Sequence, residues 1–227
     1  MEITRNNIII LIILFSSLFS NEEFNYKIKY FGIHVADCSI SSSDTLFNNN
    51  AKIKKVIFDV KTKSFFDFFF PINNKYSIYL NRENRILSFT KNTDQPKVEN
   101  FLKTEIINDK VFYSDSNFEI LPNYYNIFSV LYILMSGKIL PEYFIMEREG
   151  LVYNSSINLD EKKMMYTLDL KKIESDDYSI IPHTDIFTWA VFMENAQRKI
   201  FINSKTKIIE KCVFSKGLIA ISAHLNP

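Results

Sequence analysis

The sequence predicts a mainly β fold: a single-domain curved antiparallel sheet or partly closed barrel, built as a meander, with one buried α-helix around residues 124–136. Composition is the first observation behind this prediction, because the 227 residues include 21 Phe and 12 Tyr but 4 Gly. Aromatic side chains suit a pleated, half-buried surface. A hydrophobic content of 47% is enough to build a core and argues against disorder. Alternating strands separated by short polar turns are the second observation.

Residues 1–20 have the layout of a secretory signal peptide, with a short charged start, an apolar stretch from Ile8 to Phe15 and an exit rich in serine. We expect cleavage after Ser20, with Ser17 as the second choice. The apolar stretch is shorter than the roughly 20 residues that a membrane-spanning helix needs. An uncleaved signal anchor and a buried N-terminal strand are the alternatives. The segment predicts export to the periplasm or cell envelope of a Gram-negative-type bacterium, leaving one β-rich domain at 21–227 with no membrane span.

Apolar and polar residues alternate through most of the remaining chain, which is typical of strands with one buried face. Strands with one buried face belong to antiparallel sheets, whose other face meets water. The alternation predicts strands within residues 25–30, 56–63, 164–171, 187–194 and 219–225.

Short polar turns separate the predicted strands. Residues 81–84 divide one hairpin and Asn108-Asp109 divides the next, while Glu149-Gly150, Asp160-Glu161 and Lys216-Gly217 divide later pairs. Parallel neighbours would need crossover connections of a dozen or more residues. The turns therefore predict a meander.

The segment at residues 124–136 departs from this pattern. Ile127, Val130, Leu131 and Leu134 recur at the spacing of one helical face, and the other faces are apolar too. A proline before the segment and a glycine after it are typical helix boundaries. We expect a helix buried in the concavity of the sheet, with a buried strand as the alternative.

Cys38 and Cys212 form an even pair near the two ends of the mature chain. Disulfides persist in exported proteins, so the two are a candidate disulfide that would place the first and last strands side by side. Two unpaired, buried thiols are the alternative.

Three segments resemble the domain of unknown function 3108 family of exported bacterial proteins. The segments are Tyr26-x-Ile28-x-Tyr30-Phe31-Gly32-Ile33-x-Val35-Ala36-Asp37-Cys38-Ser39-Ile40, the helix with Ser129, Leu131 and Tyr132, and the closing Lys216-Gly217-Leu218-Ile219-Ala220-x-x-Ala223-x-Leu225. Asn126 and Met135 stand where that family usually has Asp and Arg. The resemblance implies an envelope location and a β-rich fold, and it implies no reaction.

Charge and motifs exclude several function classes. The net charge is +1, and no basic patch of the kind that binds nucleic acid is visible. No Gly-x-Ser-x-Gly elbow, phosphate-binding glycine loop or zinc-ligand spacing occurs. We therefore predict no catalytic residues, no cofactor and no metal.

The most unusual local feature is a run of phenylalanines: Phe65, Phe66, Phe68, Phe69 and Phe70. Five aromatic residues within six positions cannot all be hidden on one face of a strand. The run is either an apolar lip that contacts lipid, a lipid-bearing envelope protein or an acyl ligand, or a corner of the sheet buried against the helix.

These observations favour a non-enzymatic envelope protein that binds an apolar ligand or an envelope partner. A structural or assembly factor with no ligand pocket is the alternative, followed by an enzyme with an unrecognised site.

Overall fold

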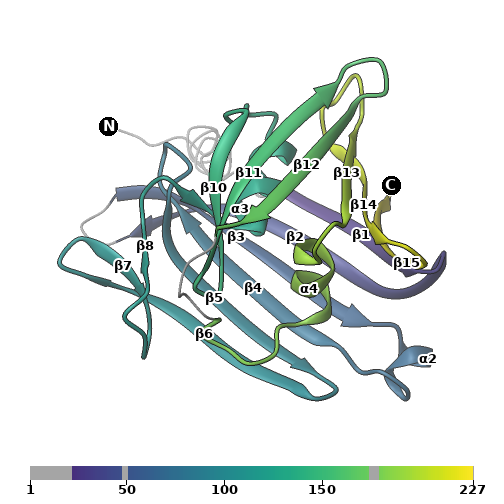
Figure 1. Ribbon diagram of the computed structural model, residues 1–227, viewed down its shortest axis with the longest axis horizontal. Coiled ribbons are helices and arrows are strands. Elements are labelled where there is room, and N and C mark those ends of the chain that lie inside the picture. Colours follow the sequence, from purple (N-terminus) through teal and green to yellow (C-terminus); the bar gives the residue numbers. More distant parts are fainter. Residues whose placement is uncertain (1–21, 48–50, 174–178, 227) are drawn as a thin grey trace, which may run out of the picture.

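The computed structural model describes residues 22–47, 51–173 and 179–226, and these form one 15-stranded sheet with three helices (Figure 1). The predicted signal peptide at residues 1–20 lies outside the described residues. The strands are β1 Glu22–Tyr30, β2 Ile33–Phe47, β3 Ala51–Thr62, β4 Asn73–Leu80, β5 Ile86–Gln95, β6 Val98–Ile107, β7 Lys110–Tyr113, β8 Glu119–Ile120, β9 Tyr124–Tyr125, β10 Tyr143–Arg148, β11 Leu151–Asp160, β12 Met165–Lys172, β13 Gln197–Ile202, β14 Ile209–Lys216 and β15 Ile219–Asn226. The helices are α2 Ser64–Asp67, α3 Ile127–Met135 and α4 Ile186–Phe192.

The sheet is a meander that bends round until it nearly closes. Strands β1 to β8 follow one another in order, and β15 to β9 continue the sheet on the other side of β1. The first and last strands are therefore neighbours, with Ile28 opposite Ala223. Strands β8 and β9 form the two ends of the sheet, and β9 pairs in parallel with β10 while the other neighbours are antiparallel. The predicted fold class is confirmed.

Tight turns join the strands where the sequence predicts them. Asn108 and Asp109 both have positive φ (50° and 62°), as the favoured two-residue hairpin turn requires, and Asn and Asp tolerate that conformation well. Phe31 and Gly32 make the same kind of turn between β1 and β2.

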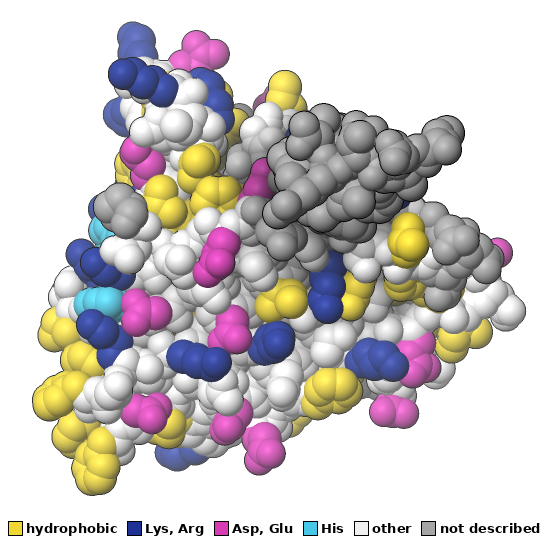
Figure 2. Space-filling view, turned by 180° about the vertical axis from the view of Figure 1, so that it is seen from behind, with side chains coloured by type: hydrophobic (Ala, Val, Ile, Leu, Met, Phe, Trp, Pro, Cys, Tyr) yellow, Lys and Arg dark blue, Asp and Glu magenta, His cyan; other side chains and the backbone are white. Residues whose placement is uncertain are grey.

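On the face of the molecule seen in Figure 2, basic and acidic side chains are interspersed.

Helix α3 confirms the predicted buried helix and begins three residues later than the predicted segment. All nine of its residues are buried. Asn126 and Ser129 form a reciprocal capping box, in which the Asn126 side chain accepts from the Ser129 amide at 2.9 Å and Ser129 Oγ accepts from the Asn126 amide at 3.0 Å. Within the described residues, no helix has the length and apolar character needed to cross a membrane.

Helix α4 corrects the predicted strand at residues 187–194. Asp185 caps its first turn by accepting hydrogen bonds from the amides of Phe187 and Thr188. At the other end, the buried Arg198 guanidinium of β13 donates to the carbonyls of Val191, Met193 and Ala196. These contacts satisfy some of the backbone groups that the ends of a short helix leave free and hold the chain that follows it, so tertiary capping overrides the alternating pattern.

The core lies between the sheet and the two longer helices. Phe128 of α3 stacks on Tyr76 of β4 with ring centroids 4.2 Å apart, and it also contacts Phe58 and Phe89 from the neighbouring strands. Phe187 of α4 contacts the same Phe128 ring at 5.7 Å. The aromatic excess in the composition is thus partly explained by this cluster.

Candidate functional site

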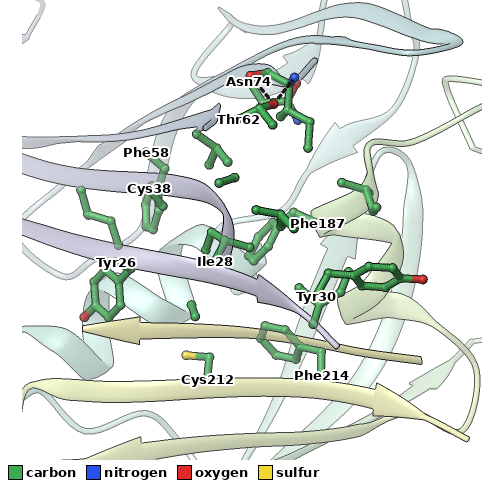
Figure 3. A pocket seen from close by; sticks show the side chains of 18 of the residues that line it. Tyr26, Ile28, Tyr30, Cys38, Phe58, Thr62, Asn74, Phe187, Cys212 and Phe214 are labelled. Carbon is green, nitrogen blue, oxygen red and sulfur yellow. Dashed lines mark hydrogen bonds between the residues drawn. The ribbon is translucent and has the colours of Figure 1, made fainter. Parts of the chain in front are cut away.

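An apolar cavity of about 520 Å³ lies inside the curved sheet (Figure 3). Its volume falls within the range of roughly 300–1,000 Å³ that is typical of small-molecule sites. Every second residue of a strand faces the same side, so each strand contributes alternate side chains to the lining. These include Tyr26, Ile28 and Tyr30 of β1, Ala36, Cys38 and Ile40 of β2, Phe58, Val60 and Thr62 of β3, Cys212 and Phe214 of β14, and Ile221 and Ala223 of β15.

Most of the few polar side chains in the lining, Tyr26, Thr62, Asn74 and Tyr76, already have partners in the protein. The Tyr26 hydroxyl donates to the Ile209 carbonyl at 2.8 Å, and the Asn74 amide donates to Gln95 Oε1 at 3.1 Å. Thr62 Oγ1 donates to a carbonyl of the β3–β4 connection at 3.1 Å. The surface that remains for an occupant is therefore mainly hydrocarbon, with little hydrogen-bonding capacity.

Cys38 and Cys212 both line the cavity, and the structure places them apart. Both thiols are free and buried, and burial raises the pKa of each to about 12. Strands β1 and β15 lie between β2 and β14. Three steps of about 4.8 Å along a sheet exceed the roughly 7 Å between Cα atoms that a disulfide allows. The predicted disulfide is corrected: the first and last strands, β1 and β15, are neighbours, but the two thiols lie on β2 and β14, one position further out on each side.

The phenylalanine run lies at the surface, in and just after the short helix α2. Phe65, Phe68 and Phe69 are 74%, 86% and 70% exposed, Phe70 is 39% exposed and Phe66 is half-buried. Phe66 and Phe70 also line the cavity. The alternative of a corner buried against the helix does not describe this segment, which instead forms part of the cavity rim.

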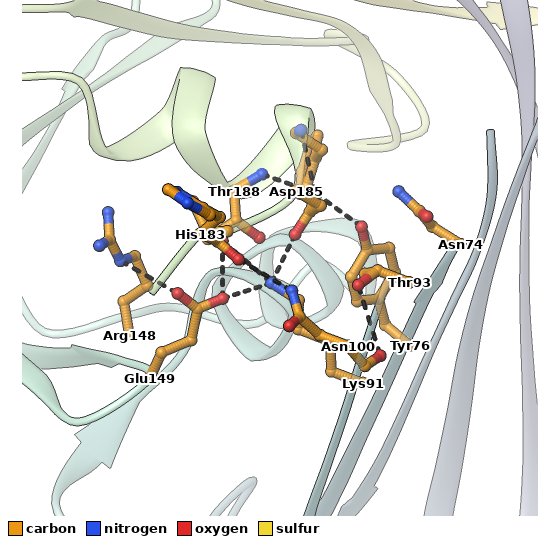
Figure 4. Close-up of polar contacts among 12 residues, drawn as sticks. Asn74, Tyr76, Lys91, Thr93, Asn100, Arg148, Glu149, His183, Asp185 and Thr188 are labelled. Atoms are coloured by element: carbon orange, nitrogen blue, oxygen red, sulfur yellow. Dashed lines mark hydrogen bonds and ion pairs between the residues drawn. The ribbon is translucent and has the colours of Figure 1, made fainter. Parts of the chain in front are cut away.

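A second cluster, which the sequence patterns did not reveal, is a buried ion-pair network (Figure 4). The Lys91 ammonium on β5 contacts Glu149, lies 2.5 Å from Asp185 Oδ2 and donates to Thr184 Oγ1 at 3.0 Å. The three charged side chains are at most 3% exposed. The Tyr76 hydroxyl donates to Asp185 Oδ1 at 2.7 Å.

The pKa values of two buried carboxyl groups in and beside this network are shifted in opposite directions. Burial alone would raise the pKa of Asp185, but the Lys91 charge and hydrogen bonds from Thr188 outweigh it and lower that pKa. Burial raises the pKa of Glu147 to about 8, although the Tyr113 hydroxyl donates to both of its oxygens. Asp185 is thus held as a carboxylate, whereas Glu147 is protonated at neutral pH.

The network positions one wall of the cavity. Lys91 joins β5 to the β10–β11 turn, through Glu149, and to the start of α4, through Asp185. Ile186 and Phe187 follow directly and line the cavity. The charges therefore serve to fix α4 across the interior, where Phe187 reaches both Tyr76 and Phe214.

The histidines make local contacts. His34 Nε2 lies 2.7 Å from Asp37 Oδ1, and His224 Nε2 lies 3.0 Å from Ser222 Oγ. Among the residues that the structure describes, no three His, Cys, Asp or Glu side chains gather as metal ligands would.

Comparison with known proteins gives a distant structural match. No family model matches the chain, and no curated protein matches it significantly. A solved structure, the crystal structure of a β-barrel-like protein of domain of unknown function DUF1849 from Brucella abortus, superimposes with a TM-score of 0.45 at 6% sequence identity. The match covers 90% of this chain and 95% of that one.

Proposed function

We propose that this protein binds a small apolar molecule, of the long-chain acyl class, in the cavity inside its sheet and leaves that molecule chemically unchanged. The observation that carries the proposal is the lining: about 520 Å³ surrounded by hydrocarbon and aromatic side chains, with most of its polar side chains bonded within the protein. Each Å² of apolar ligand surface that the cavity removes from water contributes about 25 cal/mol to binding. This hydrophobic contribution is enough to hold a flexible hydrocarbon chain in the cavity.

The same proposal includes the setting of the protein. The apolar segment at residues 8–15 supports export, and the resemblance to the domain of unknown function 3108 family supports a place in the cell envelope. An acyl chain is a common component of that compartment, so a carrier or sensor of such chains is the role that we infer.

A cavity-filling variant tests the proposal. Ala223 lines the cavity from β15, whereas Ala220 lies on the same strand and is not part of the lining. We expect Ala223→Phe to weaken binding of a fluorescent fatty acid at least tenfold, because the new ring occupies the space of the ligand. Ala220→Phe is the matched control and should bind like the unsubstituted protein.

Native mass spectrometry of the purified protein gives the second measurement. We expect a co-purifying mass in the lipid range that is reduced in Ala223→Phe. If the unsubstituted protein carries no such mass and binds no fatty acid, the cavity is not a ligand site, and the assembly-factor alternative replaces the proposal.

A further inference from the structure

Three connections meet at one end of the sheet beside the cavity. In the order β4-β3-β2-β1-β15-β14, the β3–β4, β1–β2 and β14–β15 connections all fall at the end where β1 finishes. The backbone joins them, because the Phe31 amide donates to the Ala220 carbonyl at 3.3 Å and the Lys63 amide donates to the Val35 carbonyl at 3.0 Å. We call residues 29–34, 63–72 and 216–219 the aromatic tip.

The aromatic tip exposes large apolar side chains from all three connections. Leu218 is 88% exposed, and Phe31 and Ile33 are 56% and 57% exposed, in addition to the phenylalanines of α2. Phe68 and Phe69 contact each other edge to face at 5.1 Å. Figure 2 shows hydrophobic side chains gathered at the corner of the molecule where α2 lies in Figure 1. A contiguous apolar surface of this kind is typical of an interaction site.

The charges of the tip favour an anionic partner. The tip contains Lys29, Lys63 and Lys216 against one acidic residue, Asp67, although the whole chain is nearly neutral. Lysines beside protruding aromatic and aliphatic side chains are the combination that binds the interface of a membrane containing anionic lipid.

The tip is also continuous with the cavity. Phe66 and Phe70 of the α2 segment, together with Tyr30, Phe31 and Ile33 of the β1–β2 hairpin, line the cavity as well as the rim. A lipid surface that bound the tip would therefore lie against the open end of the cavity. An acyl chain could then pass between the lipid surface and the cavity without crossing water.

We propose that the aromatic tip docks on an anionic lipid surface and that the protein exchanges its apolar ligand there. The inference rests on the proposed function for its purpose, but the docking itself depends on the tip alone. Phe65, Phe68, Phe69 and Leu218 enter the acyl boundary, and Lys63 and Lys216 contact lipid phosphates.

Flotation with vesicles tests the docking. The probes are vesicles of phosphatidylcholine alone and of phosphatidylcholine mixed with phosphatidylglycerol. We expect Phe68→Ser with Phe69→Ser to lower the vesicle-bound fraction at least tenfold, because neither side chain lines the cavity and both are free to insert. Every variant is compared with the unsubstituted protein in the same form of the chain, so any contribution of residues 1–21 is common to all of them.

Two further variants sharpen the result. Leu46→Ser with Phe101→Ser is the matched control, since both side chains are 64% exposed and lie outside the tip. This control should float like the unsubstituted protein. Lys63→Glu with Lys216→Glu should remove the preference for phosphatidylglycerol vesicles, and added salt should weaken binding of the unsubstituted protein.

Fatty-acid binding in solution separates this inference from the proposed function. The Phe68→Ser, Phe69→Ser variant should keep the fatty-acid affinity of the unsubstituted protein. If vesicle binding is the same in all variants while fatty acid still binds, the docking inference fails alone. If the tip substitutions instead abolish self-association measured by sedimentation, the tip is an interface between copies of this chain and the inference is overturned.

Discussion

Lys91 is a buried cation whose removal would leave the Asp185 carboxylate without its ion-pair partner and Glu149 with Arg148 alone, at 3.6 Å. Breaking a buried pair by deleting one partner typically costs about 3–5 kcal/mol, because the remaining charge stays desolvated. We expect Lys91→Met to lower the free energy of unfolding by that amount, measured by urea denaturation.

The exposed pair of Lys103 and Glu105 provides the control for that substitution. Their side chains are both 51% exposed and lie 3.7 Å apart. Such pairs contribute about 0–1 kcal/mol. Lys103→Met should therefore change the free energy of unfolding by no more than about 1 kcal/mol. An equally small effect of Lys91→Met would contradict the structural role of the network.

Glu147 predicts the pH dependence of stability near neutrality. Its pKa is raised in the folded protein to about 8, against an ordinary value of 4.5, so between these values the folded state binds the proton and the unfolded state does not. Stability then falls as pH rises through this window, by up to about 1.4 kcal/mol per pH unit. Asp185 has the opposite sign, because its pKa is lowered, and its contribution is lost only under acid conditions.

The variant Glu147→Gln isolates this contribution, since an amide does not titrate. Between about pH 6 and about pH 8, the free energy of unfolding measured in urea should fall by roughly 2 kcal/mol more for the natural protein than for the variant. If the free energy of unfolding changes with pH in the same way for both proteins, Glu147 is ionised in the folded state over this pH range and the prediction is wrong.

At the scale of elements, the sequence predicts the turns and helices whose conformation is determined by residues close together in the chain. The turn at Asn108-Asp109 follows from residues that tolerate positive φ, and α3 follows from an apolar segment between helix-boundary residues. Helix α4 does not follow, because Phe187, Trp189 and Val191 alternate with smaller residues as a strand would.

The groups that decide α4 are contributed by two strands, β13 and β5. Arg198 of β13 donates to the carbonyl of Val191 in the last turn of the helix and to that of Met193 just after it, and Lys91 of β5 holds the capping carboxylate of Asp185. A short helix with low intrinsic stability depends on such tertiary contacts, which a local pattern does not contain.

The same distinction applies to the candidate site. The phenylalanine run and the two cysteines stand out in the sequence. That Phe66 and Phe70 line the same cavity as both cysteines depends on how β1 to β4 meet β14 and β15. The ion-pair network is invisible for the same reason: its charged members come from separate parts of the chain, and each one alone is an ordinary residue.

At the scale of the whole molecule, the pairing of β1 with β15 in the middle of the curved sheet accounts for both the cavity and the position of the thiols. The expectation that the chain ends pair is correct, whereas the bond expected to join them is absent because the thiols sit on the strands outside that pair. Cys38 and Cys212 therefore line the cavity from β2 and β14, on either side of the β1–β15 pair, and we expect their reactivity to depend on what fills the cavity.

Thiol labelling tests this arrangement. With a pKa of about 12, each thiol is thiolate at a fraction of only about one in ten thousand near pH 8, so both should react far more slowly than an exposed cysteine. Saturation of the protein with fatty acid should slow the labelling of both thiols further. The variants Cys38→Ser and Cys212→Ser show which labelling rate belongs to which thiol. In denaturant without reductant, mass spectrometry should find both thiols alkylated. A species that takes up label only after reduction would show that the ends are covalently joined, and labelling unaffected by fatty acid would place the ligand outside the cavity.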